Sequence, residues 1–430
     1  MQFKKIGIFS MLFVLFHSEI THAQLPGIDT VRLTLPDAEQ LFIQKNLAIL
    51  AQKYSVDATK ALIIQAKLYP NPNFAFGNNI YNSVTKQWFP TSFTPGMSDW
   101  NFQISQLIVL SRKIHKQVKI AETNYKLAED NLSDLLRTLK FALRSTYFNI
   151  YYLQQTARVY DEEIHALQVI VDAYKQVQGK GYVSEAEIVQ VQAQLYSLQN
   201  EYQTLIDNIN DQQSQLRLLL QSPPNAYLKP LLDTSIVKTD PLAYSFKALM
   251  DSAYTNRTDF MIAKDNLLLS RQYHTLQKAL AVPDLNVSLN FDESSEYVHN
   301  DYMYFLGIDL PVFNRNQGNI KNARILIDYN NTQLQLTKET LEEQVTRGLQ
   351  KAIDADKLYK GIDPVFAGNF DRLASEMMKN YMKRNVNLLT FLTFYDSYKQ
   401  NIVQFNTISY NKVNALENMN FLTGTNFFNK

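Results

Sequence analysis

The chain is built as two copies of one plan, and this duplication constrains the fold more than any single motif. Pro72 with the segment 73–76 returns as Pro283 with the segment 284–287, just over 200 residues later. In each half a polar helix pattern leads into two short alternating segments, and a very long helical pattern follows. Self-similarity of this kind indicates a duplicated structural unit. Each unit has only two candidate strands, so neither can close a sheet on itself.

Proline-rich sequence separates the two copies. We place the first repeat at 24–222 and the second at 246–430, with residues 223–245 as the linker between them. The linker contains four prolines: Pro223, Pro224, Pro230 and Pro241. Proline fixes φ and has no backbone N–H, so a cluster of prolines disfavours both helix interiors and central strands.

The first 23 residues have the plan of a secretory signal peptide. Lys4 and Lys5 form a basic start, residues 6–16 are mostly apolar, and Ala23 ends a small-residue cleavage site. The apolar run is too short to cross about 30 Å of hydrocarbon, and no later segment approaches 18 consecutive apolar residues. We therefore expect an exported chain whose mature part has no transmembrane helix.

Composition excludes several partners and anchors. The chain has no cysteine, so we expect neither disulfides nor a lipidated N-terminal cysteine. The signal peptide takes two lysines and one glutamate from totals of 42 and 41, which leaves 40 residues of each charge. A neutral mature chain argues against nucleic acid or an acidic membrane surface as a partner.

Long helical patterns dominate both repeats. Residues 111–178 contain neither proline nor glycine, and such a helix would extend roughly 100 Å. In the return segment, apolar residues from Ile188 to Leu219 recur at steps of three and four. This spacing predicts a coiled-coil seam between antiparallel helices. We expect one helical hairpin at 111–221 and a second at 319–422.

Three further features complete the helical pattern. A helix is predicted from the N-cap Thr34 to about Tyr69, and its counterpart in the second repeat covers residues 246–281. Pro364 is expected to kink the long helix of the second hairpin.

Four segments of about ten residues alternate between apolar and polar side chains: 73–82, 99–108, 284–292 and 301–311. This length, with one apolar face, is typical of a tilted strand in an outer membrane, although half-buried soluble hairpins would give a similar pattern. In the membrane interpretation the polar faces line a lumen. The alternation predicts six lumen residues: Asn101, Gln103, Ser105, Asn286, Ser288 and Asn290.

Closure of the sheet separates these interpretations. The smallest useful barrels have about eight strands, and unpaired strand edges are costly in lipid, so four strands need partners from other copies of the chain. Two copies would supply eight strands and three would supply twelve. The predicted fold is therefore mainly α with a small β part. It consists of a duplicated unit of two membrane strands and a long coiled-coil hairpin, which forms a shared β-barrel and α-helical tunnel.

Aromatic residues cluster near the first strand pair. Trp88, Phe89, Phe93 and Trp100 suit the aromatic girdle at a membrane interface. In this arrangement residues 83–98 form an extracellular loop, longer than the loop 293–300 between the second pair of strands.

Three sequence motifs point to a known family. They are the segments Thr34-Leu35-Pro36-Asp37-Ala38, Gln178-Gly179-Lys180-Gly181-Tyr182-Val183-Ser184, and Gly307-Ile308-Asp309-Leu310-Pro311-Val312-Phe313-Asn314-Arg315-Asn316-Gln317-Gly318. The first resembles the opening helix, and the second resembles the periplasmic hairpin tip, of the TolC-like outer-membrane efflux protein family. The third is similar to the branch that serves heavy-metal efflux pumps of the cobalt–zinc–cadmium and copper–silver kind. The resemblance covers nearly the whole mature chain.

The resemblance implies a homotrimer with a twelve-stranded barrel in the outer membrane and a helical tunnel below it. It further implies docking to a periplasmic adaptor and, through it, to a proton-driven inner-membrane pump of the RND type. The adaptor-docking tips would contain seven residues: Gly179, Gly181, Val183, Ser184, Arg384, Val386 and Leu388. The chain departs from the family at the second tip, which lacks the usual glycine, and in having no cysteine to lipidate.

The sequence carries no catalytic or metal-binding constellation, so we expect no enzyme and no cofactor. The four histidines of the mature chain do not share a metal-site spacing: His115, His165, His274 and His299. Met377 and Met378 are adjacent on a helix and are interpreted as packing residues. Glu185 and Glu187 follow the first tip, where three copies would set six carboxylates around an opening and form a cation-favouring gate. The alternative is that they are ordinary first-turn acids of a helix.

These observations favour an exit duct for a tripartite efflux system. Heavy-metal cations are the substrates that the resemblance suggests. A duct for drugs or for type I protein secretion belongs to the same class. A soluble periplasmic coiled-coil scaffold is the alternative from another class, although two matched hairpins, each preceded by a strand pair, count against it.

Overall fold

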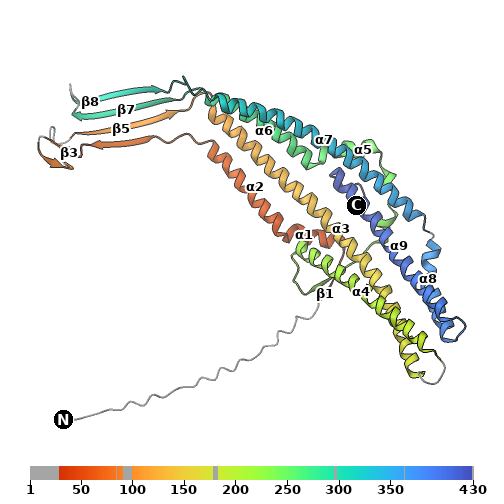
Figure 1. Ribbon diagram of the computed structural model, residues 1–430. Coiled ribbons are helices and arrows are strands. Elements are labelled where there is room, and N and C mark those ends of the chain that lie inside the picture. Colours follow the sequence, from red (N-terminus) through yellow and green to blue (C-terminus); the bar gives the residue numbers. More distant parts are fainter. Residues whose placement is uncertain are drawn as a thin grey trace, which may run out of the picture.

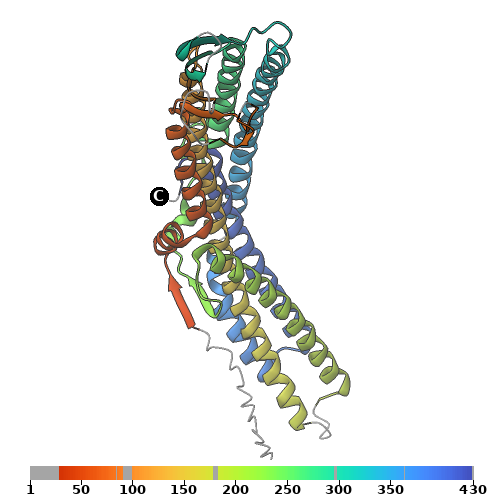
Figure 2. The same cartoon turned by 90° about the vertical axis from the view of Figure 1, so that its left-hand side faces the viewer.

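A computed structural model describes residues 29–83, 85–90, 99–177, 183–294, 298–362 and 364–428. The molecule is elongated, with a β-sheet at one end and a stalk of long helices that leads to two hairpin turns at the other end (Figure 1). Viewed from the side, the helices form one gently bent, narrow column (Figure 2). The predicted fold class, mainly α with a small β part, is confirmed.

In its described residues, the first half contains four helices and six strands. They are β1 (Asp29–Leu33), α1 (Leu35–Lys45), α2 (Leu47–Ala66), β2 (Asn73–Asn78), β3 (Tyr81–Asn82), β4 (Gln87–Trp88), β5 (Trp100–Ile108), α3 (Lys113–Val177), α4 (Glu185–Leu220) and β6 (Ala226–Pro230). The helix predicted from Thr34 to Tyr69 is wrong in one respect, because Asn46 breaks it. The Asn46 backbone is extended, and its side-chain oxygen accepts hydrogen bonds from the N–H groups of Ala48 and Ile49. It therefore caps a new helix.

The second half repeats the order of helix, strand pair and hairpin. Its elements are α5 (Phe246–Asn256), α6 (Thr258–Leu280), β7 (Leu285–Ser294), β8 (His299–Ile308), α7 (Gln317–Lys360), α8 (Pro364–Met382) and α9 (Leu388–Thr423). Pro364 does more than kink the long helix: α7 ends at Lys360 and α8 begins at Pro364. This position suits proline, because the first turn of a helix needs no backbone N–H donor from it.

The long helices bury the seams that the sequence predicts. α3 has 65 residues and packs along α4, with Val191 and Leu198 of α4 fully buried. Among the described residues, the hydrophobic side chains form three local cores along the length of the narrow molecule. One joins α1 to the middle of α3, one joins the lower parts of the two hairpins, and one joins α5 to α7 and α9.

The segment 223–245, interpreted as a linker, instead contains part of a small parallel sheet. β6 pairs with β1 from Asp29 opposite Ala226 to Leu33 opposite Pro230, and two short 3₁₀ turns follow at Thr234–Lys238 and Pro241–Ala243. The buried Tyr147 hydroxyl donates to the carbonyl oxygens of Leu33 and Leu231, at 2.8 and 2.6 Å. This pairing ties the start of the chain to the connection between the repeats.

The four long strands form one antiparallel sheet in the order β2-β5-β7-β8. The observed strands start and end within a few residues of the predicted ones, except that β2 ends at Asn78 and a separate two-residue pairing, β3 with β4, follows it. The central contact joins β5 of the first repeat to β7 of the second, with Gln103 opposite Asn290. The two repeats therefore share one sheet.

Candidate functional site

The register of the sheet gives it one polar and one apolar face. Successive strand residues point to opposite faces, and residues directly opposite each other in neighbouring strands share a face. The polar face collects the following residues from the three strands β2, β5 and β7: Asn73, Ala75, Gly77, Asn101, Gln103, Ser105, Asn286, Ser288, Asn290 and Asp292. All six residues predicted from the alternation lie on this face. Leu107 of β5 and Met303 and Phe305 of β8 share it and are its large apolar exceptions.

The opposite face is aromatic and aliphatic. Its apolar residues are Phe74, Phe76, Trp100, Phe102, Ile104, Ile108, Leu285, Val287, Leu289, Phe291, Tyr302, Tyr304, Leu306 and Ile308, and Asn78 and Gln106 are its polar exceptions. Several of these side chains are largely exposed, with Tyr302 at 79% and Leu306 at 64%. Within the sheet the rings contact one another, as do Phe291 and Tyr302 at 4.9 Å between centroids. An exposed apolar patch of this extent marks a surface that meets an apolar environment.

Both outer strands of the sheet are open. Among the described residues, β2 and β8 each pair with one neighbour only, so their outer edges present unpaired backbone N–H and C=O groups. Such an edge readily accepts another strand. The sheet is thus an incomplete structure, with an apolar face and two edges that require partners.

The small β3–β4 pairing lies beyond the outer end of β2. Trp88 contacts Tyr81 at 5.0 Å between ring centroids, and Trp88 and Phe89 are each 70% exposed. Trp100 lies at the start of β5, where it contacts Phe102. Phe93, the fourth residue of the predicted aromatic girdle, lies outside the described residues.

A buried ion pair fixes the sheet to the helices. Lys113 at the start of α3 is buried, and its Nζ lies 2.7 Å from an Asp284 carboxylate oxygen just before β7. The same carboxylate accepts a hydrogen bond from the N–H of Leu110 at 2.8 Å. Asp284 directly follows the repeated Pro283, so this ion pair joins the strand segment of the second repeat to the first helical hairpin.

The first hairpin tip is partly described. Gly179 and Gly181 lie outside the described residues, whereas Val183 and Ser184 lie inside them. Ser184 caps α4: its Oγ accepts from the Glu187 N–H, and the Glu187 carboxylate accepts from the Ser184 N–H at 3.0 Å. This capping box gives Glu187 a local structural role. Glu185 is an exposed first-turn acid.

The second tip turns without glycine. Arg384 adopts a left-handed backbone with φ of 61°, the Arg384 N–H donates to the Tyr381 carbonyl, and the Asn385 N–H donates to the Asn380 carbonyl. These are the bonds of a Schellman-type helix end, in which glycine is usual. Asn387 then caps α9 by accepting from the Thr390 N–H at 2.8 Å. Leu388 is buried while Val386 is half-buried, so only part of the predicted docking tip is accessible.

The two hairpins are joined side by side above the tips. The hydroxyls of Tyr174 on α3 and Tyr381 on α8 form a hydrogen bond, and the Tyr381 ring stacks on Phe391 of α9 at 4.3 Å. Buried residues of α3, α4, α8 and α9 form one cluster around them. The packing of each hairpin therefore depends on the other.

This cluster encloses charged groups. Lys399 of α9 is buried and pairs with Glu201 of α4 at 2.8 Å and with Asp396 at 3.4 Å. Glu163 of α3 is 2% exposed, and its Oε2 has no hydrogen-bond partner. Burial raises the pKa of Glu163 to about 8, with smaller contributions from the negative charges of Asp396 and Glu201, while Lys399 opposes the rise.

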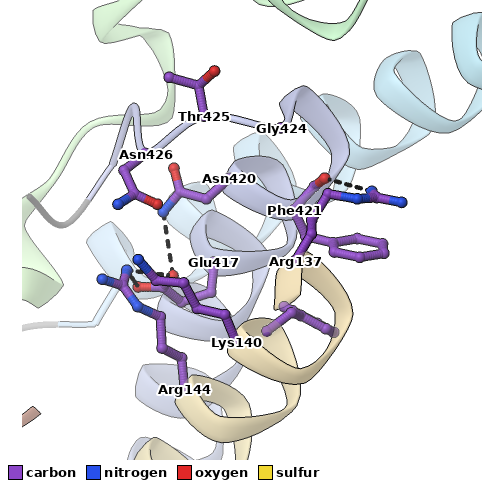
Figure 3. Close-up of a pocket in the computed structure, with 10 residues that line it drawn as sticks. Arg137, Lys140, Arg144, Glu417, Asn420, Phe421, Gly424, Thr425 and Asn426 are labelled. Atoms are coloured by element: carbon purple, nitrogen blue, oxygen red, sulfur yellow. Dashed lines mark hydrogen bonds and ion pairs between the residues drawn. The ribbon is translucent and has the colours of Figure 1, made fainter. Parts of the chain in front are cut away.

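A cavity of about 270 Å³ lies where the C-terminal end of α9 meets α3 (Figure 3). Three cations line it, and each of them already contacts an anion or a carbonyl. Arg144 pairs with Glu417 at 2.9 Å, and Arg137 donates to the Phe421 carbonyl at 2.9 Å and covers the Phe421 ring. Lys140 lies 3.5 Å from Glu39. The polar groups of this cavity hold the helices together, and we assign it no ligand.

No group of three or more His, Asp or Glu side chains in the described part of the chain converges as metal ligands. In the same ranges, no helix has both the length and the apolar character needed to cross a membrane.

Comparisons with known proteins agree with this architecture. Residues 39–221 match the sequence profile of the family described as outer membrane efflux protein. The cobalt-zinc-cadmium resistance protein CzcC of Cupriavidus metallidurans is 23% identical over 305 residues, which are 68% of this chain and 66% of CzcC, just under two thirds of its length.

Two solved structures show the same fold over nearly the full length. The CmeC outer membrane channel of Campylobacter jejuni has a TM-score of 0.74 at 16% identity, covering 92% of this chain and 86% of CmeC. The CusC structure has a TM-score of 0.71 at 14% identity, covering 95% of this chain and 96% of CusC.

Proposed function

We propose that the chain, whose residues 39–221 match the outer membrane efflux protein family, belongs to this family and is the outer-membrane exit duct of a tripartite efflux system. It is a transport protein without enzymatic activity. We propose that it reaches the outer membrane through a cleaved signal peptide, without lipidation, and that it carries substrate from the periplasm to the outside.

One observation carries this proposal: a four-stranded sheet that is open at both edges and apolar on one face stands on a column of long helices. Edges of this kind must be paired in a membrane, because no water is present there to form hydrogen bonds with the backbone N–H and C=O groups. Strands from other copies of the same chain would pair them, β8 of one copy beside β2 of the next. The apolar face would then meet lipid and the polar face would line the lumen.

The polar face also favours three copies over two. Two copies supply eight strands, and the interior of an eight-stranded barrel is largely filled by its own side chains. The polar-face side chains of β5 and β7, including the amides of Gln103 and Asn290, would fill so narrow a barrel. Three copies supply twelve strands and a wider interior. The helical columns of the same three copies would continue the lumen as a tunnel.

The hairpin tips are the proposed docking surface for a periplasmic adaptor, and through it for an inner-membrane RND-type pump. The tip residues are Gly179, Gly181, Val183, Ser184, Arg384, Val386 and Leu388. We also propose that Glu185 and Glu187 of three copies surround the periplasmic opening and favour cations there. For Glu187 this role would be additional to its capping bond with Ser184.

Heavy-metal cations are the proposed substrate. The similarity to CzcC, named for cobalt, zinc and cadmium resistance, supports this choice. Deletion of the gene should increase sensitivity to such metals. Unchanged metal tolerance with increased sensitivity to organic drugs, or with lost secretion of a polypeptide, would contradict the metal substrate and leave the duct in place.

Two adjacent residues of β7 offer a matched test of the barrel. Leu289 lies on the apolar face and is 63% exposed, and Asn290 lies on the polar face. Asn290→Lys should leave trimers and membrane insertion intact and shift the ion selectivity of single channels toward anions. Leu289→Lys should impair insertion, since a lysine at the bilayer midplane costs about 2–4 kcal/mol.

The measurement is the mass of the detergent-extracted protein, followed by conductance in planar bilayers. A soluble periplasmic monomer would overturn the duct in favour of the scaffold. If Leu289→Lys and Asn290→Lys had equal effects on membrane insertion and on ion selectivity, the assignment of the two faces would be refuted.

A further inference from the structure

A groove between α3 and α8 collects sulfur and nitrogen donors just above the tips. It has a volume of about 410 Å³. Its lining residues include Glu162 and His165 from α3 and Met378, Lys379 and Met382 from α8. Three of the ten methionines of the chain lie within the six residues 377–382. Two of these three, four residues apart on one helix, line the groove and so share a face.

We propose that this groove binds a soft monovalent cation, Cu(I) or Ag(I), through the thioethers of Met378 and Met382 and the imidazole of His165. The inference rests on the proposed efflux function, which it deepens by naming a substrate class and a place where the cation binds. The groove lies next to the hairpin tips, and in the proposed function the transported cation enters the channel at these tips.

The types of ligand select this cation. Thioether sulfur is a soft donor that favours Cu(I), and imidazole also binds copper. Methionine is the only sulfur donor available, because the chain has no cysteine. Zn²⁺ is bound in proteins by thiolate, imidazole and carboxylate groups, and thioether sulfur is not among these ligands. The groove has one carboxylate, Glu162, which pairs with Arg158 at 3.4 Å, and the ammonium of Lys379 offsets its charge.

Packing alone does not explain the position of Met382. It is 55% exposed at the last residue of α8, so it fills no core there. Met378 is partly buried against the cluster between the hairpins and also lines the groove. Met377 packs against the same cluster but is not part of the groove lining, which makes it a matched control.

The test is titration of the detergent-extracted protein with Ag(I) in chloride-free buffer, followed by calorimetry and by metal analysis after desalting. We expect one Ag(I) per chain. Met378→Leu with Met382→Leu should weaken binding at least tenfold, and His165→Gln should also weaken it. Met377→Leu should leave binding unchanged. Leucine conserves side-chain volume, and an unchanged oligomer mass and thermal transition would verify the fold.

Equal Ag(I) binding by the wild type and the Met378→Leu/Met382→Leu variant would overturn the site, as would equal loss in the Met377→Leu control. Conductance of the same samples separates this result from the proposed function. Wild-type channels that conduct but bind no Ag(I) would refute the site and leave the duct standing. Absence of channels would refute the duct itself, and with it the role of the site in efflux.

Discussion

Replacement of the buried Glu163 by glutamine should make the protein more stable at alkaline pH and leave it unchanged in acid. Glu163 lies between the two hairpins, 2% exposed, with one carboxylate oxygen unpartnered. The nearest cation, Lys399, is already paired with Glu201 and Asp396. An ionised Glu163 therefore has no dedicated partner to offset its burial.

The direction of the pH effect follows from the raised pKa. Burial raises the pKa of Glu163 from 4.5 to about 8 in the folded chain. The folded state thus holds this proton more tightly than the unfolded state does. The contribution of Glu163 to stability is fully present below pH 4.5, falls as the pH rises, and is lost above about pH 8.

The size of the effect can be estimated from the same values. Each pKa unit corresponds to about 1.36 kcal/mol, so the full pH range represents about 5 kcal/mol per chain as an upper value. Unfolding entropy is about 2.1 cal/mol/K per residue, which for about 400 residues converts 1 kcal/mol into about 1.2 °C of melting temperature. Glu163→Gln should therefore melt about 2–6 °C above the wild type at pH 9, and at nearly the same temperature at pH 4.5.

Thermal unfolding of the detergent-extracted protein, monitored by tryptophan fluorescence at pH 4.5, 7 and 9, measures this difference. Glu162→Gln is the matched control, because Glu162 is the adjacent carboxylate on α3 and its side chain is 54% exposed. The difference in melting temperature between Glu162→Gln and the wild type should not increase from pH 4.5 to pH 9. A melting-temperature difference for Glu163→Gln that stays constant from pH 4.5 to 9 would refute the reasoning.

The same thermal assay tests three further expectations. Leu198→Ala should destabilise the hairpins by about 2–5 kcal/mol, because Leu198 is fully buried, while Val189→Ala at an exposed position of the same helix should have little effect. Ser184→Ala should cost about 0.5–2 kcal/mol by removing the cap of α4, and a melting temperature equal to the wild type would show that the capping box contributes nothing. Arg384→Gly should stabilise the protein by up to about 1–2 kcal/mol, because Arg384 bears the cost of a left-handed backbone, whereas the β-branched Arg384→Val should destabilise it; the opposite order would contradict the described turn.

Local sequence patterns determined the elements of this protein. The unbroken run without proline or glycine predicted α3, and steps of three and four residues predicted the buried seam of α4. Strict alternation predicted β5 and β7, and it also assigned all six polar residues to one face, because a period of two is a property of the strand itself. The tip positions followed from the ends of these patterns.

Only the tertiary structure decided how distant segments pair. β1 and β6 lie almost 200 residues apart in the sequence, and their parallel pairing leaves no local signal. The prolines around β6 also argued against a strand in this segment. The side-chain cap of Asn46 broke a helix whose apolar pattern runs through it.

The sequence by itself determined the repeat, the lengths of the hairpins and the two faces of each strand, because propensity and periodicity act within one segment. The tertiary structure decided that β5 and β7 join the two repeats, that one carboxylate oxygen of the buried Glu163 has no hydrogen-bond partner, and that Met378, Met382 and His165 line one groove. These features depend on which helices and strands meet, and that choice minimises the free energy of the whole chain.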